Sequence, residues 1–320
     1  MSRIVAADEL GIAQAVEALR RGGVIGLPTE TVYGLAADAT NDEALRRVFA
    51  VKDRPATHPL IVHVADAPQL DALALEVSDS CRVLTTHAWP GPLTVIVHAN
   101  DTVSRVATGG RDTVAVRVPA HRAALAIITQ LGRPLAAPSA NRFGEVSPTS
   151  ARHVADDLGD DVDVIVDGGD CAVGVESTIV DCTTPQPEIL RPGAITAEDI
   201  ALLLDPHGVA LASEPTGESR APGMLARHYA PKARLHLVEP GSPLPRATAP
   251  VLDCSHDLAS VARTLYGSLR DLDQRGVQEV NVLMPPPLGL GHAIRDRLQK
   301  AAFPARVGSL NRGGPTPPHS

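Results

Sequence analysis

Apolar positions recur along this chain at two spacings, one typical of helices and the other of strands. Residues 8–21 have the alanine and leucine spacing of an amphipathic helix, with Asp8 as its N-cap and Gly22-Gly23 as its end. A second helix opens at Asn41 and ends near Lys52. Further helices are predicted at residues 67–75, 78–88, 121–131 and 196–204, and strands at 23–28, 60–64, 93–98, 113–119, 134–138, 162–167, 177–181 and 189–193.

These elements predict an α/β fold. Several strands follow one another without a helix between them, so the sheet is expected to be mixed and twisted rather than all parallel. Polar residues gather where strands end, as in Pro138-Ser139-Ala140-Asn141. Ligands of open α/β sheets bind at such strand ends.

The chain divides into four segments by composition. The mixed-sheet unit covers residues 1–205, and residues 206–232 lack periodicity and are rich in Pro and Gly, which predicts a linker. Residues 233–302 predict a smaller, Rossmann-like α/β unit, and residues 303–320 a disordered tail. Elements predicted in the second unit are strands at 234–238, 249–253 and 277–283 and helices at 257–275 and 288–302.

Composition narrows the function classes. Aromatic residues make up only 2% of the chain, so the core is expected to be aliphatic and each aromatic side chain is informative. Residues 1–205 carry 16 Lys and Arg against 28 Asp and Glu. Such an acidic unit argues against stable nucleic-acid binding, which needs clustered cations.

Several common sites are absent from the sequence. The four cysteines form no Cys-x-x-Cys pair, and no metal-ligand motif is found. There is no P-loop, dinucleotide fingerprint, nucleophile elbow or HExxH motif. No signal peptide and no apolar run of membrane-spanning length is found, which leads us to expect a cytoplasmic protein without membrane contact.

Two local features each have two interpretations. The stretch from Gly26 to Leu35 places hydroxyls, a carboxylate and a tyrosine between glycines at a strand end, which suits either a binding site or an ordinary polar turn. Arg117 projects from an otherwise apolar strand, either as an exposed edge residue or as an anion clamp. The remaining candidates are cations, hydroxyls and amides without an obvious nucleophile: Lys52, Arg54, His58, His63, Ser139, Asn141, Thr178 and Arg191. Such a set suits a reaction driven by positioning and charge neutralisation, such as nucleotidyl transfer.

Seven motifs occur in an order that resembles a known family. The motifs are PTETVYGL, KxRP followed by PLIVH, WPGPLT, VAVRVP, PSAN, ESTIVD and LRPG. In this order they resemble the YrdC-like domain, and the later APGMLARHYAP with the small second unit makes the chain similar to the two-domain threonylcarbamoyl-AMP synthases. The resemblance covers roughly residues 5–302.

The resemblance implies roles for individual residues. It implies threonine contacts from Thr31, His63, Arg117 and Thr178, and ATP contacts from Arg54, His58, Thr113, Ser139, Asn141 and Arg191. Lys52 and Arg54 are the implied catalytic cations, and His228 and Tyr229 the implied lid. His58 departs from the family pattern, which has asparagine at this position.

The implied reaction joins L-threonine, bicarbonate or CO2 and ATP to give L-threonylcarbamoyladenylate and pyrophosphate. The product would pass to a tRNA threonylcarbamoyl-transfer machinery, and Mg2+ is expected only because ATP is a substrate. Two alternatives remain open. An RNA-binding or regulatory protein could use the same domain, and a hydrogenase-maturation carbamoyl transferase would bring zinc-finger cysteines that this chain lacks.

Overall fold

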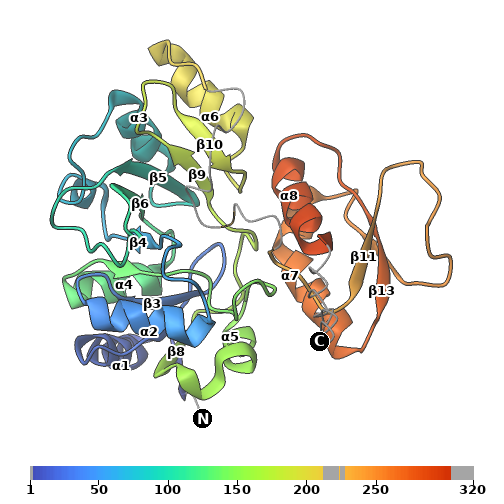
Figure 1. The fold of residues 1–320 in the computed structure, drawn as a ribbon, viewed down its shortest axis with the longest axis horizontal. Helices are drawn as coiled ribbons and strands as arrows, with labels where there is room; N and C mark the ends of the chain where they lie inside the picture. Colours follow the sequence, from blue (N-terminus) through green and yellow to red (C-terminus); the bar gives the residue numbers. More distant parts are fainter. Residues whose placement is uncertain (1–2, 212–222, 224–227, 304–320) are drawn as a thin grey trace, which may run out of the picture.

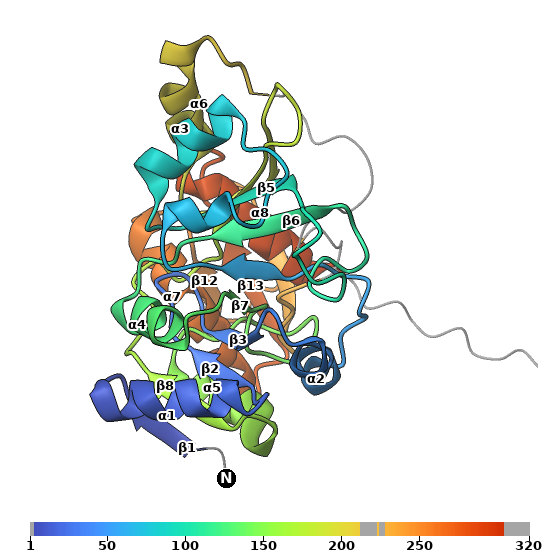
Figure 2. The same cartoon turned by 90° about the vertical axis from the view of Figure 1, so that its left-hand side faces the viewer.

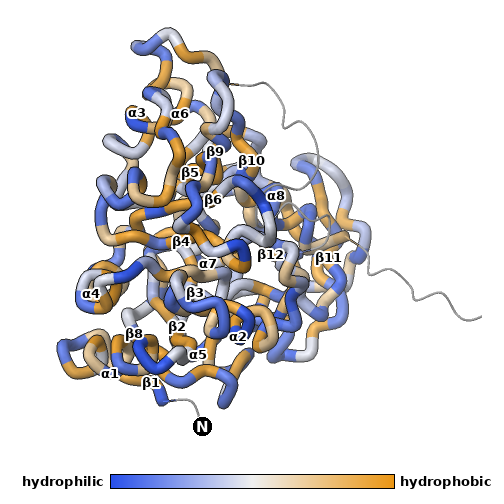
Figure 3. The backbone as a smooth tube through the Cα atoms, turned by 60° about the vertical axis from the view of Figure 1, so that its left-hand side comes forward, coloured by the Kyte–Doolittle hydropathy of each residue, from blue (hydrophilic) through white to orange (hydrophobic). Residues whose placement is uncertain are grey.

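The larger unit is built on one mixed sheet of ten strands. The computed structural model describes residues 3–211, Gly223 and residues 228–303. The strand order is β1-β8-β2-β3-β7-β4-β6-β5-β9-β10. The strands are β1 (Arg3–Ala6), β2 (Ile25–Leu27), β3 (Gly34–Asp38), β4 (Ile61–His63), β5 (Leu93–His98), β6 (Thr113–Arg117), β7 (Leu135–Ala136), β8 (Val164–Asp167), β9 (Thr178–Asp181) and β10 (Glu188–Arg191). Except for β1, which is mostly exposed, these strands consist mainly of buried hydrophobic residues (Figure 3).

Helices cover both faces of this sheet. They are α1 (Glu9–Arg20), α2 (Asp42–Lys52), α3 (Asp79–Ala88), α4 (Arg122–Leu131), α5 (Ala151–Leu158) and α6 (Ala197–Leu204). The apolar side chains of α1 and α4 share one core cluster, whereas those of α2, α3, α5 and α6 share another. Accordingly, α1 and α4 lie together on one flank and α2 on the other (Figure 2).

The pairing of the strands brings the predicted site residues together. β4 and β6 are parallel, and their register sets His63 opposite Arg117. β2 and β3 are antiparallel with Leu27 opposite Gly34, so the polar stretch between them forms the connection of a hairpin. A single β-bridge between Gly34 and Ser139 brings the polar loop after β7 next to this hairpin connection.

The smaller unit packs its two helices against the larger one. Its three strands are parallel in the order β11-β13-β12. Its elements are β11 (Arg234–Val238), β12 (Val251–Asp253), β13 (Glu279–Leu283), α7 (Leu258–Gln274) and α8 (Leu290–Ala302). Both helices lie between the two sheets (Figure 1). Their core cluster also contains Val32, Val146 and Val175 of the larger unit, so one apolar core spans the interface.

The predicted mixed α/β fold is confirmed, although four elements differ from the prediction. The helix predicted at residues 67–75 is wrong beyond one turn: a short 3-10 helix, η1 (Ala67–Leu70), begins after the cap Asp66. Strands β1 and β3 and helix α5 were not predicted. The linker prediction lies partly on residues 212–222 and 224–227, and the tail prediction on residues 304–320, which are outside the described residues. No described helix is long and apolar enough to span a membrane.

Candidate active site

Polar residues from four loops and the linker surround a cavity of about 60 Å3 at the ends of the central strands of the large sheet. Its described lining consists of Thr29, Val32, Gly34, Arg54, Ile61, His63, Ala137, Pro138, Ser139, Glu176, Arg191, Gly223, His228 and Tyr229. Six predicted site residues are among them: Arg54, His63, Ser139, Arg191, His228 and Tyr229. Each water occupies about 30 Å3 in the liquid, so the cavity as observed is too small for a nucleotide.

The hairpin connection between β2 and β3 is held by its own hydroxyls. Thr29 Oγ1 donates to the Val32 carbonyl at 2.6 Å and lies 2.9 Å from Thr31 Oγ1. The Tyr33 hydroxyl donates to the Gly169 carbonyl at 2.8 Å and accepts from the Gly168 amide at 3.0 Å. The connection is therefore a braced turn that also forms one wall of the cavity, and Tyr33 is a brace within it.

Arg117 is a buried anion partner, and the exposed-edge interpretation is wrong because β6 lies inside the sheet. Its side chain is 4% exposed, and Nη2 lies 2.6 Å from Glu30 Oε1. Nη1 donates to Thr31 Oγ1 at 2.9 Å, and Nε donates to the Gly91 carbonyl at 3.1 Å. Burial acts to raise the pKa of Glu30, but the charge and hydrogen bond of Arg117 lower it below its usual value.

His63 lines the cavity as a neutral imidazole. Burial, followed by the positive charge of Arg117, lowers its pKa to about 3. Nδ1 lies 3.1 Å from the Ile61 carbonyl, which only accepts hydrogen bonds, so Nδ1 carries the proton. The lone pair on Nε2 is consequently the acceptor that this ring offers to a ligand.

Two arginines bring positive charge to the cavity. Arg54 Nη2 donates to the Pro59 carbonyl at 2.9 Å, while its buried Nε has no hydrogen-bond partner among the described residues. Burial lowers the pKa of Arg54 to about 10, which still leaves the guanidinium charged at neutral pH. Arg191 is buried and donates Nε to the Ser177 carbonyl at 3.0 Å. Both guanidiniums suit an anionic ligand such as a phosphate.

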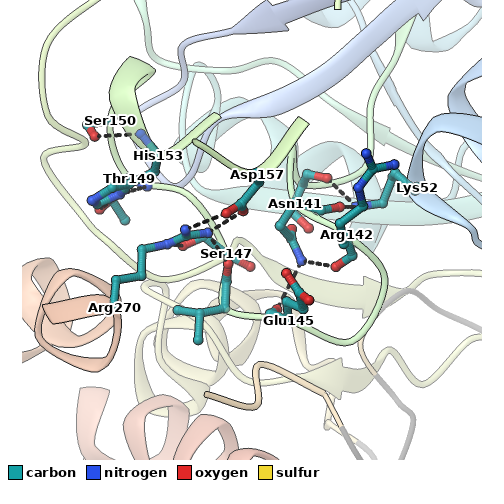
Figure 4. A network of polar contacts seen from close by, with 12 residues as sticks. Lys52, Asn141, Arg142, Glu145, Ser147, Thr149, Ser150, His153, Asp157 and Arg270 are labelled. Atoms are coloured by element: carbon teal, nitrogen blue, oxygen red, sulfur yellow. Dashed lines mark hydrogen bonds and ion pairs between the residues drawn. The ribbon is translucent and has the colours of Figure 1, made fainter. Parts of the chain in front are cut away.

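Lys52 is not in the described lining of the cavity and binds the neighbouring loop, and its catalytic role stays a prediction. The residue is 1% exposed, and its Nζ donates to the backbone carbonyls of Ser139, at 2.5 Å, and Asn141. The Asn141 side chain in turn donates to the carbonyls of Arg142 and Glu145 (Figure 4). Burial lowers the pKa of Lys52 well below its usual value. Lys52 and Asn141 therefore shape the loop that presents Ser139.

Thr31 and Arg117 are not in the described lining of the cavity, and neither are three other predicted residues, Thr178, His58 and Thr113. The Thr178 hydroxyl donates to the Ile195 carbonyl at 2.6 Å and accepts from the Ile195 amide at 3.1 Å. His58 is partly exposed with its ring 5.5 Å from the Phe143 ring. Thr113 begins β6, four residues before Arg117. Their ligand contacts remain predictions.

The lid residues close the cavity from the linker side. His228 and Tyr229 are 8% and 1% exposed, and their rings are 4.1 Å apart in an edge-to-face contact. His228 Nδ1 and the Tyr229 hydroxyl are buried without hydrogen-bond partners among the described residues. Burial lowers the pKa of His228 to about 3. Unpaired buried polar atoms beside a cavity indicate that a polar ligand completes them.

Glu176 is a cavity residue that the motif analysis did not single out, although ESTIVD contains it. Its Oε1 accepts from Ser147 at 2.6 Å, and its Oε2 accepts from Tyr266 at 2.8 Å and Arg297 at 2.7 Å. Burial acts to raise its pKa, but Arg297 and Arg191 lower it to about 2. The sequence did not indicate a role for Glu176 because its partners are far away along the chain: Arg297 lies 121 positions from it.

The described residues do not form a metal site. No cluster of three His, Cys, Asp or Glu side chains is found in the described part of the chain. Glu176 is the one carboxylate in the described lining, and its two oxygens are occupied by Ser147, Tyr266 and Arg297. The donor set therefore does not fit a protein-held Mg2+ ion, which prefers free oxygen ligands.

Two family models match consecutive parts of the chain. One, described as telomere recombination and named Sua5_yciO_yrdC, matches residues 17–193. The other, described as the C-terminal domain of threonylcarbamoyl-AMP synthase, matches residues 195–303. Both parts of the molecule therefore have relatives.

Curated relatives and solved structures match nearly the whole chain. Threonylcarbamoyl-AMP synthase of Pyrococcus abyssi is 39% identical over 92% of this chain and 95% of its own length. The synthase of Bacillus subtilis is 40% identical over 91% of this chain and 92% of its own. A crystal structure of P. abyssi Sua5 complexed with L-threonine is similar with a TM-score of 0.85 and 37% identity, covering 94% of this chain and 97% of that chain.

Proposed function

Because the chain belongs to the threonylcarbamoyl-AMP synthase family, we propose that its closed cavity is the place where L-threonine, bicarbonate or CO2 and ATP are joined. The family establishes the enzyme class and the product, L-threonylcarbamoyladenylate. The observation that carries the assignment of the site is that neutral His63 and two arginines, Arg54 and Arg191, line one cavity, with Arg117 opposite His63 on the neighbouring strand.

We propose that threonine occupies the part of the cavity beside Thr31, His63 and Arg117. A relative has been solved with L-threonine, and Arg117 already holds a carboxylate, that of Glu30. A guanidinium has five N–H donors. Arg117 can therefore bind the carboxylate of a ligand that enters beside Thr31 while it keeps its ion pair with Glu30. His63 Nε2 then accepts a hydrogen bond from the amine or hydroxyl of threonine.

We propose that ATP lies on the side of Arg54, Ser139 and Arg191. A guanidinium keeps its positive charge at neutral pH, and Arg54 Nε has no partner among the described residues. Lys52 supports this half by fixing the carbonyls of the loop that presents Ser139. In this assignment Lys52 is a positioning residue, and Arg54 and Arg191 are the residues that stabilise charge on the phosphates.

The reaction follows from this placement. The free amine of threonine takes up CO2 to form a carbamate and releases one proton to water, and a carbamate oxygen then attacks the α-phosphorus of ATP as the bond to pyrophosphate breaks. Arg54 and Arg191 stabilise the charge that develops on the phosphate oxygens. The amine nitrogen of threonine needs its lone pair to react with CO2. A neutral His63 can accept a hydrogen bond from this amine without donating a proton to it. Mg2+ is proposed to enter with ATP as part of the substrate, and no step is assigned to a protein-held ion.

The lid excludes water from this chemistry. The cavity of about 60 Å3 is far below the ~300 Å3 or more of a typical ligand site, so His228 and Tyr229 must move outward to admit ATP. Their return would shield the carbamate from hydrolysis. We further propose a cytoplasmic location, where ATP, threonine and the tRNA that receives the threonylcarbamoyl group are found together.

The experiment that tests the proposal is identification of the product. The protein is incubated with ATP, Mg2+, L-threonine and 13C-bicarbonate, and the products are separated and weighed by mass spectrometry. A species with the mass of threonylcarbamoyl-AMP carrying one 13C atom is expected. Pyrophosphate with AMP alone, and no labelled adenylate, would overturn the assignment of the site to this reaction.

A further inference from the structure

Helix α8 of the smaller unit reaches the active-site cavity through one buried arginine. The Arg297 side chain is 1% exposed. Its Nε donates to Glu176 Oε2 at 2.7 Å, and its Nη2 donates to the Pro192 carbonyl at 3.0 Å. Its guanidinium carbon lies 5.1 Å from the centre of the Tyr229 ring, on the face of that ring. One side chain of the second unit therefore contacts a cavity carboxylate, the loop after Arg191 and the lid.

A second residue of the same helix face holds the lid backbone. Lys300 Nζ donates to the Gly223 carbonyl at 2.6 Å, and the Lys300 carbonyl accepts from the His228 amide at 3.3 Å. Asp296 joins the two cations, at 2.5 Å from Arg297 and 2.7 Å from Lys300. Residues three and four apart lie on one face of a helix, so α8 presents a continuous charged surface to the lid.

The lid tyrosine adopts a backbone conformation that needs support. Tyr229 has φ of 61°, which is in the left-handed region that bulky residues rarely occupy. Such a conformation persists only where the surroundings hold it. Its ring contacts both the Arg297 guanidinium and the Tyr266 ring, with the two tyrosine centroids 5.8 Å apart. Both supports come from the smaller unit, α8 and α7.

We propose that the smaller unit sets the closed position of the lid, and that Arg297 is the positioning residue through which it does so. Glu176 anchors the guanidinium, and the cation over the ring face fixes Tyr229. The expected effect of Arg297 on turnover rests on the proposed function, whereas its effect on the position of the lid does not. When Arg297 loses its planar guanidinium, the lid closes less often, so turnover falls while substrates still reach the pocket.

The experiment compares two conservative substitutions of arginine by lysine. Arg297→Lys keeps a cation beside Glu176 but loses the flat group over Tyr229. Arg270→Lys is the matched control, because Arg270 also joins the two units, through Asp157 at 2.5 Å, and its described hydrogen bonds go to Asp157, Val146 and Ser147 and not to the lid (Figure 4). Tyr229→Leu and the double variant with Arg297→Lys complete a mutant cycle.

Arg297→Lys is expected to lower kcat about tenfold with little change in the KM for threonine, whereas Arg270→Lys keeps kcat within about twofold. If Arg297 acts through Tyr229, the double variant is no slower than Tyr229→Leu alone. Wild-type kcat in Arg297→Lys, an equal loss in Arg270→Lys, or additive losses in the cycle would each overturn the inference.

A second readout does not depend on activity. Hydrogen exchange of the backbone amides of residues 228–230 is expected to be at least about tenfold faster in Arg297→Lys than in Arg270→Lys, because the lid opens more often. Equal exchange in the two variants would overturn the inference. A wild-type protein that lacks threonine-dependent activity would refute the proposed function instead, and the exchange result would still decide the role of Arg297.

Discussion

Arg117 Nη2 lies 2.6 Å from Glu30 Oε1, and neither side chain is more than 9% exposed. Arg117 therefore already binds one carboxylate, that of Glu30. A buried arginine without a partner would be costly, and Glu30 stabilises it within the hairpin connection. In the proposed site, a threonine carboxylate would join an existing charge arrangement at Arg117 and Thr31.

Replacing Arg117 tests the threonine side of the cavity. Arg117→Lys keeps a positive charge for Glu30 but cannot bond Glu30, Thr31 and a ligand carboxylate at once. The KM for threonine is expected to rise at least about tenfold, roughly 1.4 kcal/mol, with a smaller effect on the KM for ATP. The measurement is initial-rate kinetics with each substrate varied, and Arg82→Lys at the exposed pair with Asp71 is the control. An unchanged threonine KM would refute the assignment.

Replacing Arg54 tests the ATP side. Arg54→Ala removes a charged donor and leaves the Pro59 carbonyl without it. We expect kcat/KM for ATP to fall about 100-fold, since removing one donor to a developing oxyanion costs this order of magnitude. The circular dichroism spectrum should match that of the wild type. Full activity with ATP would show that Arg54 is not a phosphate contact.

Lys52 tests the loop that presents Ser139. Lys52→Met leaves two carbonyls, those of Ser139 and Asn141, without their donor. Each unsatisfied buried group costs about 1–3 kcal/mol, so the free energy of unfolding should fall measurably in urea titrations. A variant as stable as the wild type but inactive would instead favour direct contact between Lys52 and the phosphates.

The histidines of the cavity predict a dependence of stability on pH. The pKa values of His63 and His228 are about 3 in the folded protein, below the usual 6.5. The unfolded chain therefore binds protons first as the pH falls, so the stabilisation present above pH 6.5 is lost as the pH approaches 3. Between pH 7 and 5 the loss is about 2 kcal/mol for each histidine.

Urea unfolding at the two pH values measures this effect. His63→Asn preserves the donor to the Ile61 carbonyl and removes one titrating group, so its stability should change less with pH than that of the wild type. The same pH dependence in both proteins would show that His63 is not held neutral by the fold.

The sequence predicted the elements with clear periodicity and missed those without it. Helices α1 and α4 and strand β5 were predicted within one residue at each end, because their apolar spacing is regular. β3, with the sequence GLAAD, is buried on both faces and shows no alternation. The helix α5 has only three buried residues among charged ones. The cap Asp66 and Pro68 in the first turn are typical of the start of a helix, but only one turn of 3-10 helix, Ala67–Leu70, follows.

Local motifs located the site but not the pairs that join distant segments. The motifs identified six of the cavity-lining residues, which lie at or beyond the end of a strand or helix or in the linker. Glu176 and Arg297 are 121 positions apart, and Arg270 and Asp157 are 113 apart. No local periodicity links such residues, because a helix or strand pattern relates only positions a few residues apart. The paired state of Arg117 likewise depends on the register of β4 and β6.

The central claim is that this cavity couples threonine to ATP cleavage. The most direct measurement is pyrophosphate release from ATP in the presence of Mg2+ and bicarbonate, with one amino acid added at a time. Release is predicted to depend on L-threonine, to require bicarbonate, and to fall sharply in Arg117→Lys at low threonine. Release that is equal with every amino acid, or that is unchanged when threonine is omitted, would contradict the account.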